Sequence, residues 1–257
     1  MTDQRLPLSV CLIAGAEAQR IRRTLDSVVG WVEEIIVVIN DDVADGTDKI
    51  AEAAGAKVFR ESWKGYGPQK NSASDKATQP WLLNLDADEE VTPALRDEIR
   101  SALSAPGDYV AFCFPRRTRF CGRWIRHGDW YPDRQTRLWR RGRARWSDVP
   151  VHETLLANGP VGRLGAELRH QPTETVDRQI AKISAYTEAF AREVGAQDRR
   201  VGWSDIALRP LWRLFRGYVL RLGILDGWQG AYIAWMTAFY TATRYVKVRL
   251  SQTDSRK

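Results

Sequence analysis

The sequence predicts an α/β protein built on a mostly parallel sheet with helices on both faces. Two observations lead to this prediction. The first hundred residues alternate continuous apolar runs with segments of helical spacing, which is typical of strand–helix–strand crossovers over a parallel sheet. The length of 257 residues also suits one large α/β domain with an appendage.

Four apolar runs are expected to form the buried strands. Each run is continuous rather than alternating, as in strands that are covered on both faces. The expected strands comprise residues 8–14, 34–39, 57–59 and 81–85. The expected helices comprise residues 17–29, 46–55, 71–78 and 93–105, the last with Thr92 as its cap and Pro93 at its first position.

Beyond residue 106 the pattern changes to short strands and then to helices. Extended runs over residues 109–114, 136–139 and 146–149 lie between clusters of Gly, Pro and Arg. Residues 175–194 and 203–250 have helical spacing. We therefore expect mixed strands and loops in the middle of the chain and amphipathic helices at its C-terminus.

The composition is that of a globular protein that folds without cross-links. Hydrophobic residues make up 44% and charged residues 28% of the chain, which argues against disorder. The 3 cysteines form no CxxC pair, which excludes a disulfide framework and a zinc site of that type and favours a reducing compartment. The N-terminal apolar run is shorter than a signal-peptide core, and we expect it to be a strand of a cytoplasmic protein.

Charge is distributed unevenly along the chain. Residues 1–100 hold 12 basic and 18 acidic side chains, whereas the whole chain has a net charge of +7. We expect the basic remainder to meet an anion, such as a phosphorylated glycolipid or a membrane surface. Nucleic acid is not an expected partner, because the sequence has no recognition motif and its acidic first part would repel phosphate.

Acidic and amide side chains follow two of the expected strands. Asn40, Asp41 and Asp42 end one strand, and Asp86 and Asp88 follow another. Because ligands bind beyond the carboxyl ends of parallel strands, we expect these groups on one ligand-binding rim. Two carboxylates two residues apart on a turn suit a divalent cation such as Mg²⁺ or Mn²⁺ that also contacts a substrate phosphate. A solvated acidic turn is the alternative.

Several long motifs resemble one enzyme family. The segment LDADEEVTPAL, preceded by GYGPQKNSASDKATQPWLLN, is similar to the metal-binding core of family-2 glycosyltransferases. Three later segments resemble the branch of bacterial lipopolysaccharide-core β-1,4-glucosyltransferases, namely CGRWIRHGDWYPDRQTRLWRRGRARWSDVPVHE, NGPVGRL and RPLWRLFRGYVLRLGILDGWQGAYIA. The resemblance runs from about Leu8 to Val248, nearly the whole chain.

This resemblance implies a GT-A fold and a division of the chain. Residues 1–174 would form the catalytic domain, with a nucleotide-sugar half over about residues 1–106 and an acceptor half over about residues 107–174. Residues 175–257 would form a helical region that associates with a membrane or a partner.

The resemblance also implies an inverting, metal-dependent hexosyltransferase. It would transfer a hexose, glucose in this branch, from a nucleotide-diphosphate sugar such as a UDP-sugar to a lipid-linked saccharide such as the lipopolysaccharide inner core. The alternatives are a polyprenyl-phosphate or capsule-precursor acceptor, and a catalytically degenerate module that binds anionic lipid. Two departures leave the nucleotide open, because Ala16 and Asn40 stand where the family usually has Asn and Asp.

Matching positions carry the implied roles in donor binding. Asp88 corresponds to the direct ligand of a Mg²⁺ or Mn²⁺ ion, and Asp86 to a residue that reaches the ribose, or the metal through water. Glu17, Asn40 and Lys70 correspond to nucleotide-sugar-binding residues. A cation and a lysine stabilise the negative charge that the diphosphate gains as the sugar bond breaks.

An inverting transfer needs a base for the acceptor hydroxyl on the face opposite the diphosphate. Glu153, in the segment Val151-His152-Glu153, is the first candidate, and Asp133 is the second. His152 is either a metal or phosphate contact or a structural polar residue beside the pocket.

An arginine-rich stretch is expected to bind the acceptor. Residues 116–145 contain 11 arginines and no lysine, and a guanidinium group binds carboxylate or phosphate through two parallel hydrogen bonds. Aromatic residues among these arginines suit stacking on sugars, or alternatively a hydrophobic core. Arg126, Trp130 and Arg137 are the expected acceptor-binding residues for an anionic lipid-linked saccharide.

The C-terminal helices are expected to lie on the inner face of the cytoplasmic membrane. Leu211, Trp212 and Phe215 share one side of a helix that Arg213 and Arg216 flank, a pattern typical of interfacial helices. The uncharged run over residues 227–243 is shorter than the roughly 20 apolar residues that a spanning helix needs. We therefore expect peripheral association, with packing on the catalytic domain or on a second copy as the alternative.

Overall fold

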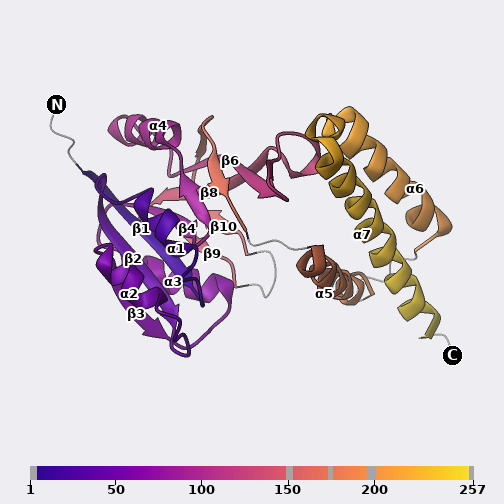
Figure 1. The fold of residues 1–257 in the computed structure, drawn as a ribbon, viewed down its shortest axis with the longest axis horizontal. Helices are drawn as coiled ribbons and strands as arrows, with labels where there is room; N and C mark the ends of the chain where they lie inside the picture. The colour runs from indigo at the N-terminus through magenta and orange to yellow at the C-terminus, as the bar shows by residue number, and fades with distance from the viewer. Residues whose placement is uncertain (1–4, 149–152, 173–175, 196–200, 255–257) are drawn as a thin grey trace. The chain divides into compact units, whose positions relative to one another are not determined.

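The structure, a computed structural model, describes residues 5–148, 153–172, 176–195 and 201–254 (Figure 1). The chain divides into two compact units. The first unit comprises Met1–Arg116 and Asp133–Gln171, and the second unit comprises Arg117–Pro132 and Pro172–Lys257. The segment 117–132 therefore interrupts residues 1–174 and belongs with the C-terminal helices; the assignment of residues 1–174 as the catalytic domain stays a prediction.

Four parallel strands form one half of the sheet in the first unit. They are β1 (Leu6–Ala14), β2 (Val32–Asn40), β3 (Lys57–Glu61) and β4 (Trp81–Asp86), in the order β3-β2-β1-β4. The direction of winding reverses between β1 and β4, and ligands bind at such switch points in open α/β sheets.

The carboxyl ends of these strands are level with one another. Ile13 of β1 pairs with Asp86, Ala14 pairs with Ile39, and Asn40 pairs with Glu61 at the end of β3. The polar residues that follow β2 and β4 therefore share one edge of the sheet, as the sequence predicts.

Helices cover both faces of the parallel strands, as predicted. The chain forms α1 (Ile21–Asp26), α2 (Thr47–Ala53), α3 (Tyr66–Asp75) and α4 (Pro93–Ser104). Successive strand residues point to opposite faces, and the two hydrophobic cores separate accordingly. One core joins α1, α2 and α4 to the β1 residues Leu8, Val10 and Leu12. The other joins Ala73 of α3 to Cys11.

Two helices differ in extent from the predictions. α1 is shorter because turns occupy both flanks of the expected segment 17–29. α3 covers Tyr66–Asp75 rather than residues 71–78, because it begins directly after Gly65, whose φ of 98° favours glycine. Pro68 lies in its first turn, where a missing N–H breaks no helical hydrogen bond. The predicted cap of α4 is confirmed, since Thr92 Oγ1 accepts from the Leu95 N–H at 3.2 Å.

The other half of the sheet is mixed. β8 (Asp133–Arg140) runs antiparallel to both β4 and β6 (Ala111–Phe120), and β12 (Leu168–His170) pairs with β5 (Glu89–Val91). β11 (Val161–Arg163) pairs with β6, while β9 (Ala144–Trp146) and β10 (Leu155–Ala157) form a separate two-stranded sheet. Because β5 follows the turn after β4, its pairing with β12 brings His170 opposite Glu89.

The second unit consists of helices and a small hairpin. It contains β7 (Arg123–Trp124), η1 (Gly128–Trp130), α5 (Val176–Gly195), α6 (Trp203–Phe215), the π-helical η2 (Arg216–Leu220), the 3₁₀-helical η3 (Gly223–Asp226) and α7 (Gly227–Asp254). α5 and α6 both pack on α7. None of the helices in the described ranges combines the length and the apolar composition that crossing a bilayer requires.

Candidate active site at the carboxyl edge of the parallel strands

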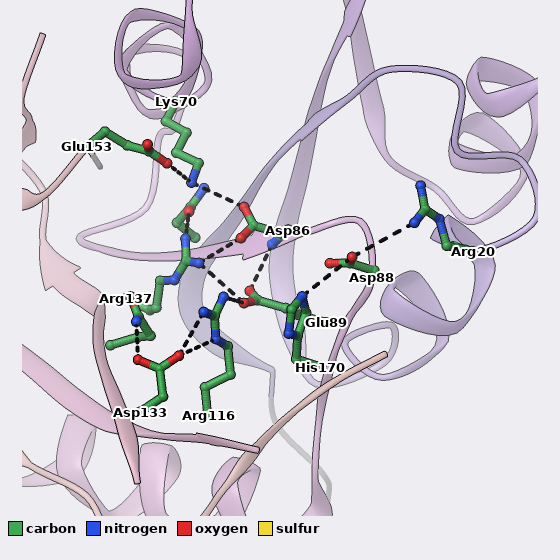
Figure 2. Close-up of polar contacts among 12 residues, drawn as sticks. Arg20, Lys70, Asp86, Asp88, Glu89, Arg116, Asp133, Arg137, Glu153 and His170 are labelled. Atoms are coloured by element: carbon green, nitrogen blue, oxygen red, sulfur yellow. Dashed lines mark hydrogen bonds and ion pairs between the residues drawn. The ribbon is translucent and has the colours of Figure 1, made fainter. Parts of the chain in front are cut away.

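The turn that carries Asp86 and Asp88 is fixed by its neighbours. It follows β4 directly, and the Thr24 hydroxyl of α1 donates a hydrogen bond of 2.9 Å to the carbonyl of Ala87 between the two aspartates. The Asp86 N–H donates to Glu89 Oε2 at 2.9 Å. These two bonds hold the turn, and the two aspartates contact different partners (Figure 2).

Asp86 is held between two cations. Its Oδ1 lies 3.2 Å from Lys70 Nζ of α3, and its Oδ2 lies 2.7 Å from an Arg137 nitrogen of β8. Burial acts to raise the pKa of Asp86, but Arg137 and Lys70 outweigh it and hold this pKa well below its usual range. Asp86 is therefore ionised at neutral pH.

Arg137 lies inside this site. Its side chain is buried, and it also donates to Asn84 Oδ1 at 2.6 Å and lies 3.2 Å from Glu89 Oε1. Burial opposes its charge, yet Asp86 and Glu89 raise its pKa. These contacts were not predicted, because Arg137 was expected on the acceptor surface together with Arg126 and Trp130.

Asp88 has a separate set of partners. Its Oδ2 lies 3.5 Å from His170 Nε2 of β12 and 4.0 Å from Arg20, which also forms an ion pair with Glu17. Burial raises the pKa of Glu17, although Arg20 acts against this shift. Asp88 therefore lies beside the imidazole of His170. Arg20 lies between Asp88 and Glu17, the acid predicted on the nucleotide side.

Helix α3 contacts Glu153 through Lys70 and binds the strand residue Trp146 through Asn71 and Lys70. Lys70 Nζ lies 2.8 Å from Glu153 Oε1, and the Asn71 amide exchanges two hydrogen bonds, of 3.0 and 2.9 Å, with the backbone of Trp146. Lys70 Nζ also lies 4.6 Å from the centre of the Trp146 ring. A Cβ at Gly67 would lie 2.1 Å from the carbonyl oxygen of Ser147, so only glycine lets the helix approach this closely.

Asp133, the rival candidate base, is tied to other side chains. Its Oδ2 lies 2.7 Å from an Arg116 nitrogen, and its Oδ1 accepts from the Gln135 amide at 2.7 Å. Arg116 also reaches Glu89 at 3.1 Å, and the two carboxylates outweigh burial and raise the pKa of Arg116. Both Asp133 oxygens are therefore already engaged, whereas Glu153 has one ion-pair partner among the described residues, Lys70.

The network as a whole has more carboxylates than fixed cations, and Figure 2 labels all of these charged residues except Glu17. Six carboxylates meet four Lys or Arg side chains, so its formal charge is −2 with His170 neutral. The carboxylates are Glu17, Asp86, Asp88, Glu89, Asp133 and Glu153, and the cations are Arg20, Lys70, Arg116 and Arg137. Such a site repels a diphosphate unless a further cation is present.

The described donor atoms suit a cation shared with a ligand. Asp88 offers a carboxylate and His170 an imidazole, and Mg²⁺ or Mn²⁺ commonly completes its shell with water and substrate phosphate. No group of three or more His, Cys, Asp or Glu side chains within the described ranges could hold a metal ion by itself.

Most of the predicted donor-side residues meet at this edge, and several contacts were not predicted. Asn40 lies at the last position of β2, level with the site. His152 falls outside the described residues, and Arg126 and Trp130 belong to the second unit. The roles of Arg20, Arg116 and His170 were not predicted from the sequence; only the position of Arg20, three residues after Glu17, offered a signal.

The sequence of the chain is similar to a family of known proteins. The model described as glycosyl transferase family 2 matches residues 9–158. The lipopolysaccharide core biosynthesis glycosyltransferase LpsC of Rhizobium meliloti (strain 1021) is 30% identical over 249 residues, covering 91% of this chain and 91% of that protein. An uncharacterized glycosyltransferase of Rickettsia felis is 27% identical over 269 residues, covering 97% of this chain and 92% of the relative.

The fold also has solved counterparts. S. aureus TarS 1-349, solved in complex with UDP-GlcNAc, covers 98% of this chain and 92% of its own with a TM-score of 0.52 at 13% identity. This likeness confirms the predicted GT-A-type fold. Since the family model spans more than half of the sequence and LpsC is similar along nearly all of it, the chain belongs to glycosyl transferase family 2.

Proposed function

We propose that this protein is an inverting hexosyltransferase that moves a hexose from a UDP-sugar to a lipid-linked saccharide. One observation carries the proposal: Lys70 joins the carboxylate of Asp86, at 3.2 Å, to that of Glu153, at 2.8 Å. A donor-side acid and a candidate base thus lie on either side of one lysine, as a transfer between a diphosphate sugar and an acceptor hydroxyl requires.

The relatives support the substrate classes. LpsC is named for lipopolysaccharide core biosynthesis, which supports a lipopolysaccharide core saccharide as the acceptor. TarS was solved with UDP-GlcNAc, which supports a UDP-sugar as the donor. The resemblance of the motifs to the glucosyltransferase branch supports glucose as the hexose.

A divalent cation, Mg²⁺ or Mn²⁺, would be held by Asp88 with His170 and Asp86 beside it. When bound, it supplies positive charge that stabilises the departing diphosphate. Lys70 adds a fixed positive charge at the same place, and Glu17 and Asn40 line the same edge for the nucleotide. The network's excess of negative charge is the reason to expect that the donor binds together with a cation.

Glu153 is the proposed base. Its carboxylate accepts the proton of the acceptor hydroxyl as that oxygen attacks the sugar from the face opposite the diphosphate. Lys70 fixes the position of the carboxylate through their ion pair. Arg126 and Trp130 are proposed acceptor contacts, and Arg137 a support for Asp86. A peripheral position on the cytoplasmic face of the membrane would give the enzyme access to a lipid-linked acceptor.

The test measures transfer of labelled hexose from UDP-glucose to a lipid-linked core saccharide, and the anomeric configuration of the product. Glu153→Gln should lower turnover by about 100-fold or more while leaving UDP affinity unchanged. Asp133→Asn is the matched control and should retain most activity. The opposite pattern would assign the base to Asp133, and retention of configuration or absence of any lipid-linked product would contradict the proposed function.

A further inference from the structure

Three arginines of the second unit surround one aspartate. The Asp129 carboxylate of η1 lies 2.7 Å from Arg216, 3.0 Å from Arg221 and 3.7 Å from Arg213. Asp129 is 11% exposed, whereas the arginine side chains are 27% to 47% exposed. One carboxylate neutralises only one of the three charges, so a formal charge of +2 remains. Three guanidinium groups also have more N–H donors than two carboxylate oxygens can accept.

Close backbone packing fixes this cluster in place. A Cβ at Gly230 would lie 1.9 Å from the Gly223 carbonyl oxygen, and one at Gly223 would lie 2.6 Å from that of Gly217. The Gly128 N–H, beside Asp129, donates to the Arg221 carbonyl at 2.9 Å. The segments that carry Asp129 and the arginines are therefore in direct backbone contact, and the arginines are preorganised.

The same turn presents large apolar side chains to solvent. We call residues 219–228 the apolar tip. Five of its side chains are at least half exposed, namely Leu220, Leu222, Ile224, Leu225 and Trp228. Leu222 adopts a φ of 57°, a left-handed conformation that is unfavourable for a bulky residue. Strain at an exposed leucine contributes nothing to a buried core, so it points to a role outside the folded unit.

The charge of the second unit indicates what binds to this apolar surface. The second unit contains 18 Lys and Arg against 9 Asp and Glu, a formal charge of +9. Two copies of such a surface repel each other, whereas an anionic bilayer offers both an apolar interior and phosphate groups. Along α6, Leu208, Leu211, Trp212 and Phe215 extend the apolar face at helical spacing.

We propose that the apolar tip inserts into the interface of an anionic membrane and that Arg213, Arg216 and Arg221 bind a lipid phosphate there. Asp129 holds the three guanidinium groups together until the phosphate arrives. This proposal depends on the proposed function in one respect, since both place the acceptor in the same membrane. It adds which residues contact the lipid.

The first test measures binding of the full chain to phosphatidylcholine vesicles with and without phosphatidylglycerol. Arg213→Gln/Arg221→Gln, which leaves Arg216 paired with Asp129, should weaken binding to the anionic vesicles by about 10- to 30-fold. The control Arg141→Gln/Arg143→Gln removes the same charge from exposed positions of the first unit and should change binding by no more than about twofold. Equal losses in both variants would mean attraction by overall charge and would overturn the phosphate site.

A second variant tests the apolar tip without threatening the fold. Leu222→Asn suits the left-handed conformation better than leucine does, so the melting temperature should not fall. Binding to anionic vesicles should fall by about 10-fold because one inserted apolar side chain is lost. Unchanged binding of Leu222→Asn to anionic vesicles would contradict insertion of the apolar tip. Insertion would also be contradicted if sedimentation showed a wild-type dimer that Leu222→Asn dissociates. Binding of inorganic phosphate by the wild type without binding to either kind of vesicle would identify a free-phosphate site instead.

UDP binding measured in solution separates this proposal from the proposed function. If the wild-type chain binds UDP but does not bind anionic vesicles, only the proposed membrane contact is contradicted. A chain that binds vesicles but no nucleotide would contradict the proposed transferase alone.

Discussion

The two units of the molecule place their apolar side chains differently. Of the 24 large hydrophobic side chains that are exposed in the described part of the chain, 18 belong to the second unit, which is the smaller of the two. The first unit buries apolar residues in two cores on either side of the sheet and holds one polar network of ten charged side chains at the edge that carries Asp86 and Asp88. Its formal charge is −2, against +9 for the second unit.

This difference indicates that the two units bind different ligands. A net-negative polar edge suits a cation and a nucleotide sugar, whereas an apolar and strongly basic surface suits a lipid bilayer. Changes at the polar edge of the first unit should therefore affect nucleotide binding and transfer and spare vesicle binding, whereas changes in the apolar surface of the second unit should spare nucleotide binding.

The largest effect is expected from Asp88→Ala. Loss of this carboxylate removes the proposed cation ligand beside His170, and hexose transfer should fall roughly 1,000-fold or more. Binding to anionic vesicles should stay within about twofold of the wild type, because Asp88 lies in the first unit. Asp97→Ala, which removes an exposed carboxylate of α4, is the control for charge. Transfer at a near-normal rate in Asp88→Ala would contradict the assignment of Asp88.

A pair of glycine variants should affect the units one at a time. Gly67→Ala forces a Cβ against the Ser147 carbonyl oxygen, and Gly230→Ala forces one against the Gly223 carbonyl oxygen. Each should lower the free energy of unfolding by about 2 kcal/mol. Gly67→Ala should reduce transfer because α3 positions Glu153, and Gly230→Ala should reduce vesicle binding.

Urea unfolding, transfer and vesicle assays on both variants check this prediction. Gly15→Ala and Gly202→Ala are the matched controls, since a Cβ at either position meets no atom closer than 3.8 Å. Equal loss of both activities in each variant would show that the two units do not act separately.

The smallest effect concerns Glu61 at the end of β3. It accepts from Lys64, Lys76 and Ser72; burial opposes its ionisation, but these partners lower its pKa from 4.5 to about 2. Because the pKa of Glu61 is lower in the folded state than in the unfolded state, its ionisation stabilises the fold. This stabilisation is complete above the unfolded-state pKa of about 4.5 and is lost as the pH falls toward 2. Glu61→Gln should therefore cost about 1 kcal/mol at pH 7, and most of this cost should be gone near pH 2.

Urea titrations of wild type and variant between these two pH values measure the difference. Glu52→Gln, at an exposed position of α2, should leave the pH dependence unchanged. A constant difference between wild type and Glu61→Gln at every pH would contradict the role given to ionisation.

Local patterns in the sequence predicted the framework of the first unit. Continuous apolar runs identified β1, β2 and β4, and the order of strands and polar ends placed Asn40, Asp86 and Asp88 on one edge. Thr92 followed by Pro93 predicted the start of α4 correctly. These features depend on neighbours in the chain, so the sequence shows them directly.

Long-range contacts could not be predicted in the same way. His170 reaches Asp88 only because β12 pairs with β5, and neither short strand has a distinctive apolar pattern. Arg137 resembles its neighbouring arginines in the sequence, but its position on β8 buries it beside Asp86. The start of α3 at Tyr66 was missed because Gly65 and Pro68 resemble a loop when taken without their surroundings.

The proposed function requires the edge around Asp86 and Asp88 to bind a nucleotide-diphosphate sugar together with a divalent cation. Melting temperatures of the wild type and Asp88→Ala in the presence of UDP-, GDP-, ADP-, CMP- and dTDP-sugars, with and without Mn²⁺, test this binding. A ligand that binds only the folded state raises this temperature. We predict a rise with UDP-sugars that requires Mn²⁺ and disappears in Asp88→Ala. No rise with any nucleotide sugar, or one that persists without Mn²⁺ and in Asp88→Ala, would contradict the claim.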